Sequence, residues 1–230
     1  MAMQVEAQPL IDHFELRLSG YLREPLPIQY FEGEIHGSQV VLVVSGKDPI
    51  FGVDCIGTLP AGLAADHIIA RFKPELFVNA GTCGGFSSRG AKIGDIYLVD
   101  KTQFHDHRIS LPRYDEFARA EISTTLPLER FLIDESKVGR LSTGDSLDMS
   151  YADAEIIEKF GTHVKDMEGA AIHWVCQLYK CPLLMIKSVT DIVDGPHPTE
   201  VEFLQNLKAA SHSLQKYLGD LIETLTEEKH

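Results

Sequence analysis

The sequence predicts an α/β fold, because short apolar runs alternate with amphipathic stretches along the whole chain. Several runs are apolar at consecutive positions, which is typical of strands that are covered on both faces. We find no internal repeat, low-complexity tract or long linker that would divide the chain. With 230 residues, of which 44% are hydrophobic and 24% charged, the sequence predicts a single domain over residues 1–230.

Five short runs rich in β-branched residues are predicted to be the core strands of this domain. They are Val40–Val44, Leu76–Asn79, Ile96–Val99, Val138–Leu141 and Leu183–Val189.

Three helices are predicted from apolar spacing and from residues that favour helix ends. One covers Glu168–Tyr179, one starts at or before Pro60 and ends near Arg71, and one is capped by Ser150 with Asp153. In the first of them, apolar residues at spacings of three and four predict a single buried face. This face consists of Ala171, Trp174, Val175 and Leu178.

The last predicted helix has the strongest pattern in the chain. Thr199 and Glu202 have the T-x-x-E spacing of a capping box, so we expect the helix to begin there. One apolar stripe continues from this point, and we expect it to pack on the sheet. The stripe consists of Phe203, Leu207, Ala210, Leu214, Leu218, Leu221 and Leu225.

The charge balance and the four cysteines exclude several classes of protein. The chain has 21 Lys and Arg and 34 Asp and Glu, which gives a net charge of −13. It has no cluster of basic residues that could bind nucleic acid or an anionic membrane. No run approaches the roughly 20 apolar residues of a membrane span, and the N-terminus lacks a basic region followed by an apolar stretch, so we expect a cytoplasmic protein. The cysteines show neither CxxC pairs nor zinc-finger spacing, so we expect reduced thiols and no metal.

A glycine-rich segment follows the run that ends at Asn79. Ala80-Gly81-Thr82-Cys83-Gly84-Gly85 is predicted to be a turn at the carboxyl end of a strand, where open α/β sheets bind ligands. It lacks the G-x-G-x-x-G fingerprint and the Gly-Lys-Ser/Thr of a P-loop. The alternative, a connection that needs glycine only for its backbone angles, stays open. Cys83 is interpreted as a small residue in this turn rather than a nucleophile.

Three acidic positions are candidates for chemistry. Glu168 could accept hydrogen bonds from vicinal hydroxyls of a sugar, or, with Asp166, only stabilise the start of a helix. Asp191 comes directly after an apolar run, where partial burial would raise its pKa toward that of a general acid. Asp194-Gly195 is interpreted as a plain turn. Glu6, taken alone, is interpreted as a solvated terminal residue.

Eight segments together point to a family, and they occur in the order AMQVEAQPL, VNAGTCGGF, KIGDIYLVD, FHDHR, GRLSTGDSLDMS, KDMEGAA, SVTDIVDG and EFLQNL. With these segments the chain resembles the nucleoside phosphorylase and nucleosidase superfamily, specifically the plant-type 5′-methylthioadenosine nucleosidases, over nearly its whole length. The resemblance implies a three-layer α/β/α fold with a central mixed, partly barrel-like sheet. It also implies hydrolysis of 5′-methylthioadenosine to adenine and 5-methylthioribose in methionine salvage, without metal or organic cofactor.

The resemblance assigns roles to the polar residues. Glu6 would hold and activate the attacking water as a general base, and Asp191 would donate a proton to N7 of adenine. Glu168 would bind the ribose 2′ and 3′ hydroxyls, with Met167 packed against the sugar. Thr82 would lie near the ribose and the catalytic water.

The resemblance also assigns the apolar walls of the substrate pocket. Leu147 would lie on a face of the purine, and Met3 and Phe203 would line the pocket for the methylthio group. Core packing remains the alternative for these three residues. In family members a neighbouring subunit completes the 5′ pocket through a segment that matches His105–Tyr114, which implies a homodimer. Whether S-adenosylhomocysteine is also hydrolysed stays open.

The chain departs from the family at its amino end. Family members carry a β-strand ahead of the Ala-Met-x-x-Glu motif, whereas only Met1 precedes Ala2 here. We therefore expect that this strand is missing or that the start was assigned too late. A non-catalytic nucleoside-binding protein stays open for the same reason. A phosphorylase of the same superfamily also stays open, although Lys47 beside Asp48 is a poor site for phosphate and the position of Arg89 is unknown.

Overall fold

The structure is a computed structural model that describes residues 1–227. Its larger sheet contains β4 (Phe77–Gly85), β5 (Ile96–Phe104), β6 (Ile122–Ser123), β7 (Lys137–Thr143), β8 (Val164–Asp166) and β9 (Leu183–Ile192). The strand order is β6-β5-β7-β8-β4-β9, and a further pairing of β5 with β9 closes five of these strands into a barrel. Since parallel and antiparallel pairs both occur, the sheet is mixed and barrel-like, as predicted.

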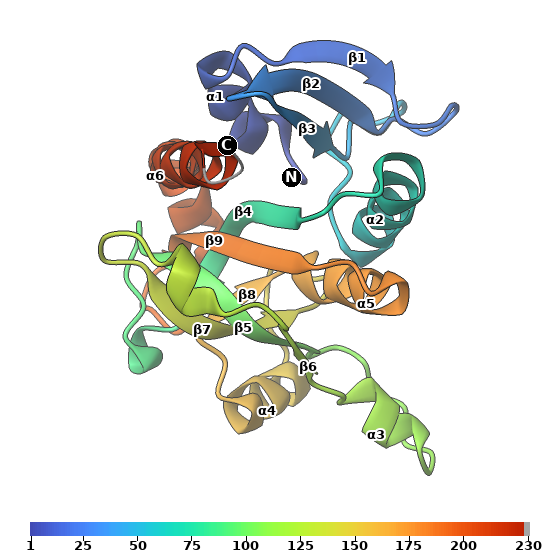
Figure 1. Ribbon diagram of the computed structural model, residues 1–230. Coiled ribbons are helices and arrows are strands. Elements are labelled where there is room, and N and C mark those ends of the chain that lie inside the picture. Colours follow the sequence, from blue (N-terminus) through green and yellow to red (C-terminus); the bar gives the residue numbers. More distant parts are fainter. Residues whose placement is uncertain (228–230) are drawn as a thin grey trace.

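Helices cover the sheets on two sides and complete a three-layer arrangement (Figure 1). The α-helices are α1 (Gln4–His13), α2 (Thr58–Phe72), α3 (Tyr114–Ala118), α4 (Tyr151–Phe160), α5 (Gly169–Tyr179) and α6 (Thr199–Glu227), with two 3-10 turns, η1 (Ser87–Arg89) and η2 (Leu128–Phe131). In the structure α1 contacts α6, and α2 contacts α5. The predicted helices at residues 60–71 and 151–160 are confirmed, and Ser150 with Asp153 forms the expected capping box.

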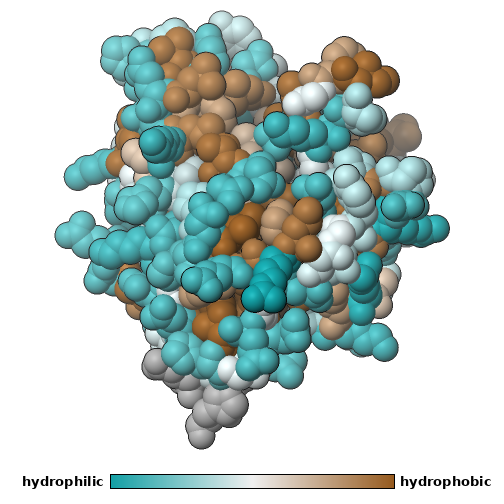
Figure 2. All heavy atoms as spheres, turned by 90° about the horizontal axis from the view of Figure 1, so that it is seen from above, coloured by the Kyte–Doolittle hydropathy of each residue, from teal (hydrophilic) through white to brown (hydrophobic). Residues whose placement is uncertain are grey.

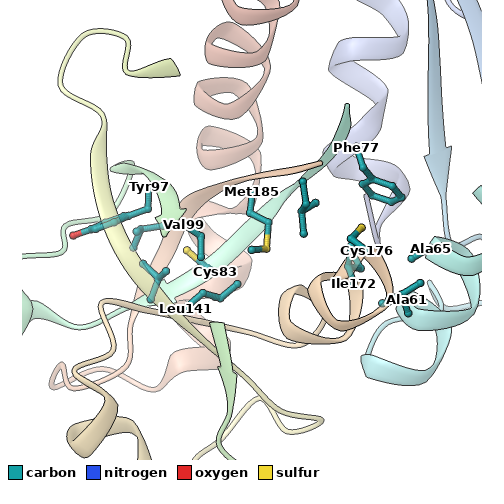
Figure 3. Packing of buried hydrophobic residues seen from close by; sticks show 14 of the residues in the cluster. Ala61, Ala65, Phe77, Cys83, Tyr97, Val99, Leu141, Ile172, Cys176 and Met185 are labelled. Carbon is teal, nitrogen blue, oxygen red and sulfur yellow. The ribbon is translucent and has the colours of Figure 1, made fainter. Parts of the chain in front are cut away.

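The central strand β9 is buried along its length from Leu183 to Asp191, which confirms the prediction from its continuous apolar run. Figure 3 shows how the core around it is built: Met185 lies near Cys83 and Leu141 of the barrel, while Ile172 of α5 lies toward α2. Each fully buried aliphatic side chain in such a core stabilises the fold by about 1.5–3 kcal/mol. The core therefore holds β9 rigidly at the centre of the molecule.

The glycine-rich segment is not a turn, so this part of the prediction is wrong. It continues strand β4, which pairs in parallel with β9 from Phe77 to Gly85. A Cβ on Gly84 would lie 2.7 Å from Oδ2 of Asp191, and a Cβ on Gly85 would lie 2.7 Å from Cβ of Ala91. The glycines at these two positions allow neighbouring segments to approach closely, rather than allowing the chain to turn.

A second, antiparallel sheet consists of β1 (Arg17–Tyr21), β2 (Gln29–Ile35) and β3 (Ser38–Val44). The predicted strand at Val40–Val44 thus exists, but it belongs to this small sheet and not to the central one. Within residues 1–227, β3 pairs only with β2, and β4 has β9 as its only partner from Phe77 to Cys83. The N-terminus lies between β3 and β4 (Figure 1), where the amino group of Met1 donates to the Val43 carbonyl at 2.8 Å.

The buried face of α5 differs from the predicted stripe. Trp174 and Leu178 are 43% and 63% exposed, whereas Ile172, Val175 and Cys176 are buried. The difference arises because α5 packs against both α2 and the barrel, so that its buried face is wider and rotated relative to the simple 3/4 pattern.

The stripe of the last helix and its start at Thr199 are confirmed, but the capping box is not. Ala210, Leu214 and Leu218 are buried against the sheet and α1. The helix begins with Thr199 itself, and Oε2 of Glu202 accepts a hydrogen bond from the Ile192 amide at 2.8 Å. The expected capping box is therefore wrong, because the carboxylate of Glu202 bonds to strand β9 instead.

The surface is mixed in character. The face seen in Figure 2 has hydrophobic patches between hydrophilic side chains. Large apolar residues that are mostly exposed include Ile50, Phe51 and Leu59, ahead of and at the start of α2. None of the helices described is long and apolar enough to cross a membrane.

Candidate active site

A cavity of about 1280 Å³ lies between α1, α2, β3, β4, β9, the start of α5 and α6. Eight residues that the sequence singled out come from six separate segments, and all of them line this cavity. They are Met3, Glu6, Thr82, Leu147, Met167, Glu168, Asp191 and Phe203. The fold thus brings together carboxylates that are up to 185 residues apart in the chain, the difference between positions 6 and 191.

Glu6 lies in the first turn of α1 and is only 2% exposed, so its interpretation as a solvated terminal residue is wrong. Its Oε1 accepts hydrogen bonds from the amide of Thr82 at 2.7 Å and from the hydroxyl of Thr82 at 2.8 Å. Its Oε2 accepts from the amide of Met3 at 3.1 Å. Carboxylate oxygens have further lone pairs, so a carboxylate fixed in this way can also accept a proton from water.

Glu168 directly precedes α5 and is within reach of the segment that leads into α2. Its Oε1 accepts a hydrogen bond from the Gly57 amide at 2.9 Å. Burial, together with the nearby Asp166 carboxylate, raises the pKa of Glu168 to about 7, although Lys187 acts in the opposite direction. Asp166 stabilises the helix start, since its Oδ2 accepts from the Gly169 amide. The capping alternative therefore holds for Asp166, while Glu168 is free of that role.

Beneath these carboxylates lies an ion pair that the sequence reasoning missed. Nζ of Lys187 is 2.8 Å from Oδ2 of Asp166, and each side chain is 1% exposed. Asp166 also accepts a hydrogen bond from the Thr143 hydroxyl. Burial lowers the pKa of Lys187, but Asp166 and Glu168 outweigh it and hold that pKa above its ordinary value. A lysine inside the mostly apolar run 183–189 was the sequence signal for this pair.

Asp191 lies near the end of β9 and is buried. Its Oδ1 accepts a hydrogen bond from the hydroxyl of Thr190 at 2.7 Å, whereas Oδ2 has no partner within the described part of the chain. The pKa of Asp191 is raised above its ordinary value, chiefly by burial and also by the charge of Glu202. The hydrogen bond from Thr190 and the charge of Lys165 lower this pKa, but they do not outweigh burial. A buried carboxyl group with a raised pKa and one free oxygen suits proton donation.

The loop that carries Leu147 is held by Lys165 of β8. Nζ of Lys165 donates to the carbonyl oxygens of Ser146 at 2.7 Å and of Leu147 at 3.0 Å. Leu147 itself is partly exposed at the mouth of the cavity. The hydrogen bonds fix the backbone of this loop and leave the Leu147 side chain as a wall of the cavity.

The segment His105–Tyr114 does not contribute to this cavity in its own protomer, judged from the residues that the structure describes. His105 is buried, whereas Leu111 and Tyr114 are more than half exposed. The apolar side chains beyond His105 therefore lie on the surface.

The residues considered for phosphate also lie elsewhere. Arg89 forms a salt bridge with Glu158 at 2.9 Å, and neither Arg89 nor Lys47 is among the described residues that line the cavity. The buried lysines of the cavity, Lys165 and Lys187, are already engaged by carbonyl oxygens and by Asp166. The arrangement thus lacks the paired cationic donors with which proteins bind a phosphate dianion.

Comparisons with known proteins agree with this architecture. The profile of the family described as "Phosphorylase superfamily" matches residues 1–223. A 5'-methylthioadenosine/S-adenosylhomocysteine nucleosidase of Arabidopsis thaliana is 43% identical over 231 residues, which cover 98% of this chain and 90% of that protein. A 5'-methylthioadenosine nucleosidase of the same plant is 43% identical over 220 residues, covering 94% and 81%.

A solved structure gives the same result in three dimensions. The apo form of an Arabidopsis thaliana 5'-methylthioadenosine nucleosidase superimposes with a TM-score of 0.92 at 41% identity, covering 97% of this chain and 92% of that one. The family match spans far more than half of the chain, and the sequence similarity extends over the strands and helices that form the cavity. On these grounds the chain belongs to the phosphorylase superfamily.

Proposed function

We propose that this protein hydrolyses the N-glycosidic bond of 5′-methylthioadenosine and releases adenine and 5-methylthioribose. The observation that carries the proposal is that Glu6 and Asp191 line one cavity without a cation set for phosphate. Both Arabidopsis thaliana relatives at 43% identity are named as nucleosidases that act on 5'-methylthioadenosine. We therefore favour water over phosphate as the nucleophile.

In this proposal the two acids divide the chemistry. Glu6, held by Thr82 and Met3, orients a water molecule and removes its proton as the water attacks the anomeric carbon. Asp191 donates its proton from Oδ2 to N7 of adenine, so that the leaving group departs neutral. Breaking a glycosidic bond through an oxocarbenium-like state between two carboxyl groups follows the general logic of glycoside hydrolysis.

The remaining residues bind the substrate. The carboxylate of Glu168 accepts hydrogen bonds from the 2′ and 3′ hydroxyls of the ribose, after exchanging its contact with the Gly57 amide. Met167 packs against the sugar and Leu147 against the purine. Met3 and Phe203 surround the methylthio group.

The protein is further proposed to act as a homodimer. Exposed apolar residues at Leu111 and Tyr114 support this proposal, because exposed apolar side chains in the segment His105–Tyr114 gain stability when a partner covers them. This segment would then complete the 5′ pocket of the neighbouring subunit.

Product analysis tests the proposed activity. The purified chain is incubated with 5′-methylthioadenosine, with and without phosphate, and adenine, methylthioribose and methylthioribose 1-phosphate are separated. We expect adenine and free methylthioribose at a rate that does not depend on phosphate. Formation of the sugar phosphate would instead establish a phosphorylase, and the absence of any product would favour a binding protein. A parallel incubation with S-adenosylhomocysteine decides whether that nucleoside is a second substrate.

A further inference from the structure

Two side chains on one face of α6 hold the backbone on both sides of Asp191. Oε2 of Glu202 accepts from the Ile192 amide at 2.8 Å, and Nδ2 of Asn206 donates to the Thr190 carbonyl at 3.0 Å. The two residues are four positions apart, so they lie one above the other on the helix surface. Both peptide groups that flank Asp191 are thus hydrogen-bonded to side chains of α6.

Further hydrogen bonds make this contact rigid. Nδ2 of Asn206 also donates to the carbonyl oxygen of Glu202 at 2.9 Å, which ties the two residues to each other. Oγ1 of Thr190 lies 2.7 Å from Oδ1 of Asp191 and 3.1 Å from the Cys83 carbonyl. Within the described residues, Oδ2 of Asp191 is the oxygen of this group that remains without a partner.

We infer that Glu202 and Asn206 are positioning residues for Asp191, fixing the backbone at 190 and 192 so that Oδ2 is aimed at the leaving group. The inference rests on the proposed function, in which Asp191 is the general acid. It assigns a use to the carboxylate of Glu202, which the T-x-x-E spacing had suggested for a helix cap. A proton donor displaced by even a fraction of an ångström loses much of its effect, since proton transfer needs hydrogen-bond distance.

The charge of Glu202 has a separate effect. Three ionisable groups from different elements face Asp191: Lys165 from β8, Cys83 from β4 and Glu202 from α6. Of these, Lys165 lowers the pKa of Asp191 and Glu202 raises it. Position and charge can be separated by substitution, because glutamine keeps the acceptor for the Ile192 amide and removes the charge.

The first test separates leaving-group protonation from general damage. Glu202→Leu and Asn206→Leu are compared with wild type on 5′-methylthioadenosine and on p-nitrophenyl 5-methylthioriboside, whose p-nitrophenolate leaving group departs without protonation. With the nucleoside we expect kcat to fall about tenfold or more while KM stays within about twofold. With the nitrophenyl compound kcat should be unchanged. Gln205→Leu, on the exposed face of the same turn, serves as the matched control.

The second test uses the conservative variant. Glu202→Gln should retain wild-type kcat at its optimum, but the alkaline limb of its pH profile should move to lower pH, because Asp191 then loses its proton earlier. Equal losses on both substrates in the leucine variants, or a kcat for Glu202→Gln as low as that of Glu202→Leu, would overturn the inference. The assay of the wild-type protein comes first: if it releases no adenine, the proposed function fails. Failure of the inference is seen only afterwards, in the comparison of the variants with an active wild type.

Discussion

Lys187 and Asp166 form an ion pair of 2.8 Å in the lining of the cavity, with both side chains almost completely buried. Around this pair lie Glu168 and the thiol of Cys83, which also interact with the ammonium group. One buried lysine thus compensates two carboxylates, those of Asp166 and Glu168.

Removal of Lys187 should therefore destabilise the protein strongly. We expect Lys187→Met to lower the free energy of unfolding by about 3–5 kcal/mol, because it leaves the Asp166 carboxylate buried without its counter-charge. Urea unfolding followed by circular dichroism measures this loss. Lys159→Met is the control, since it removes only an exposed, solvent-screened ion pair with Glu155 and should destabilise the protein far less than Lys187→Met. Similar losses in the two variants would contradict this account of the buried pair.

Substitution of Glu6 should separate turnover from binding. We expect Glu6→Ala and Glu6→Gln to lower kcat by about 10²- to 10⁴-fold, because the attacking water loses its base. Affinity for a non-hydrolysable C-nucleoside analogue, measured by calorimetry, should change little. A binding protein would show no turnover to lose, and an enzyme with unaltered kcat in Glu6→Gln would show that another group activates the water.

The pKa of Glu168 predicts how substrate affinity depends on pH. Its value of about 7 means that the carboxyl group of the free protein ionises near neutrality. The ionised form is the stronger acceptor for the two ribose hydroxyls, so affinity for the C-nucleoside analogue should weaken as pH falls through about 7. In Glu168→Gln this dependence should vanish along with much of the affinity. A wild-type binding curve that is flat between pH 6 and 8, taken as roughly one unit on either side of this pKa, would contradict the assignment.

The raised pKa of Glu168 affects stability in the opposite direction from substrate affinity: stability falls as pH rises. The folded-state pKa of Glu168 lies above its ordinary value of 4.5, so the folded state binds the proton more tightly than the unfolded chain. The contribution of this group to stability is thus complete below about 4.5 and is lost as pH rises through about 7. Comparing wild type with Glu168→Gln in urea unfolding at several pH values isolates it. A difference between the two proteins that does not change over this window would count against the shift.

The edges of β3 and β4 predict an effect of extending the chain. Both edges face the cavity, and Met1 lies between them. We expect a short apolar, β-branched segment added ahead of Met1 to pair with these edges and raise the melting temperature by about 2–4 °C per kcal/mol gained. A Gly/Ser extension of equal length is the control. Equal melting curves for the two extended chains would sink this prediction.

The sequence predicted most of the central architecture, because the continuous apolar run of β9 and the one-sided apolar stripe of α6 reflect burial directly. The stripe predicted for α5 was partly wrong, since Trp174 and Leu178 are exposed. Prediction from the sequence also failed where one residue type serves two purposes. Gly84 and Gly85 suggested a turn but permit close packing inside β4, and Glu202 suggested a helix cap but bonds to β9. Such roles depend on partners that are distant in the chain, so local spacing carries no trace of them.

In the candidate site too, residues with a local sequence signal could be predicted, and residues whose role depends on distant partners could not. Asp191 could be singled out from its place after an apolar run, and the burial that this place implies is present. Glu6 had no local signal at all, because its burial arises from contacts with Thr82, which lies 76 positions away in the chain. Only the resemblance of its motif to a family identified it. Lys187 was overlooked because its partner, Asp166, comes from another strand.

The acidic lining of the cavity has a consequence for selectivity among the adenosine compounds of a cell. Carboxylates outnumber lysines along this lining, and the two buried lysines are occupied by protein groups. AMP, ADP and ATP share the purine and ribose of the proposed substrate, but their phosphates would be repelled here by like charge. The same charges favour a sugar that turns cationic as its bond breaks. The protein would thereby discriminate against phosphorylated adenosine compounds while it acts on an uncharged nucleoside.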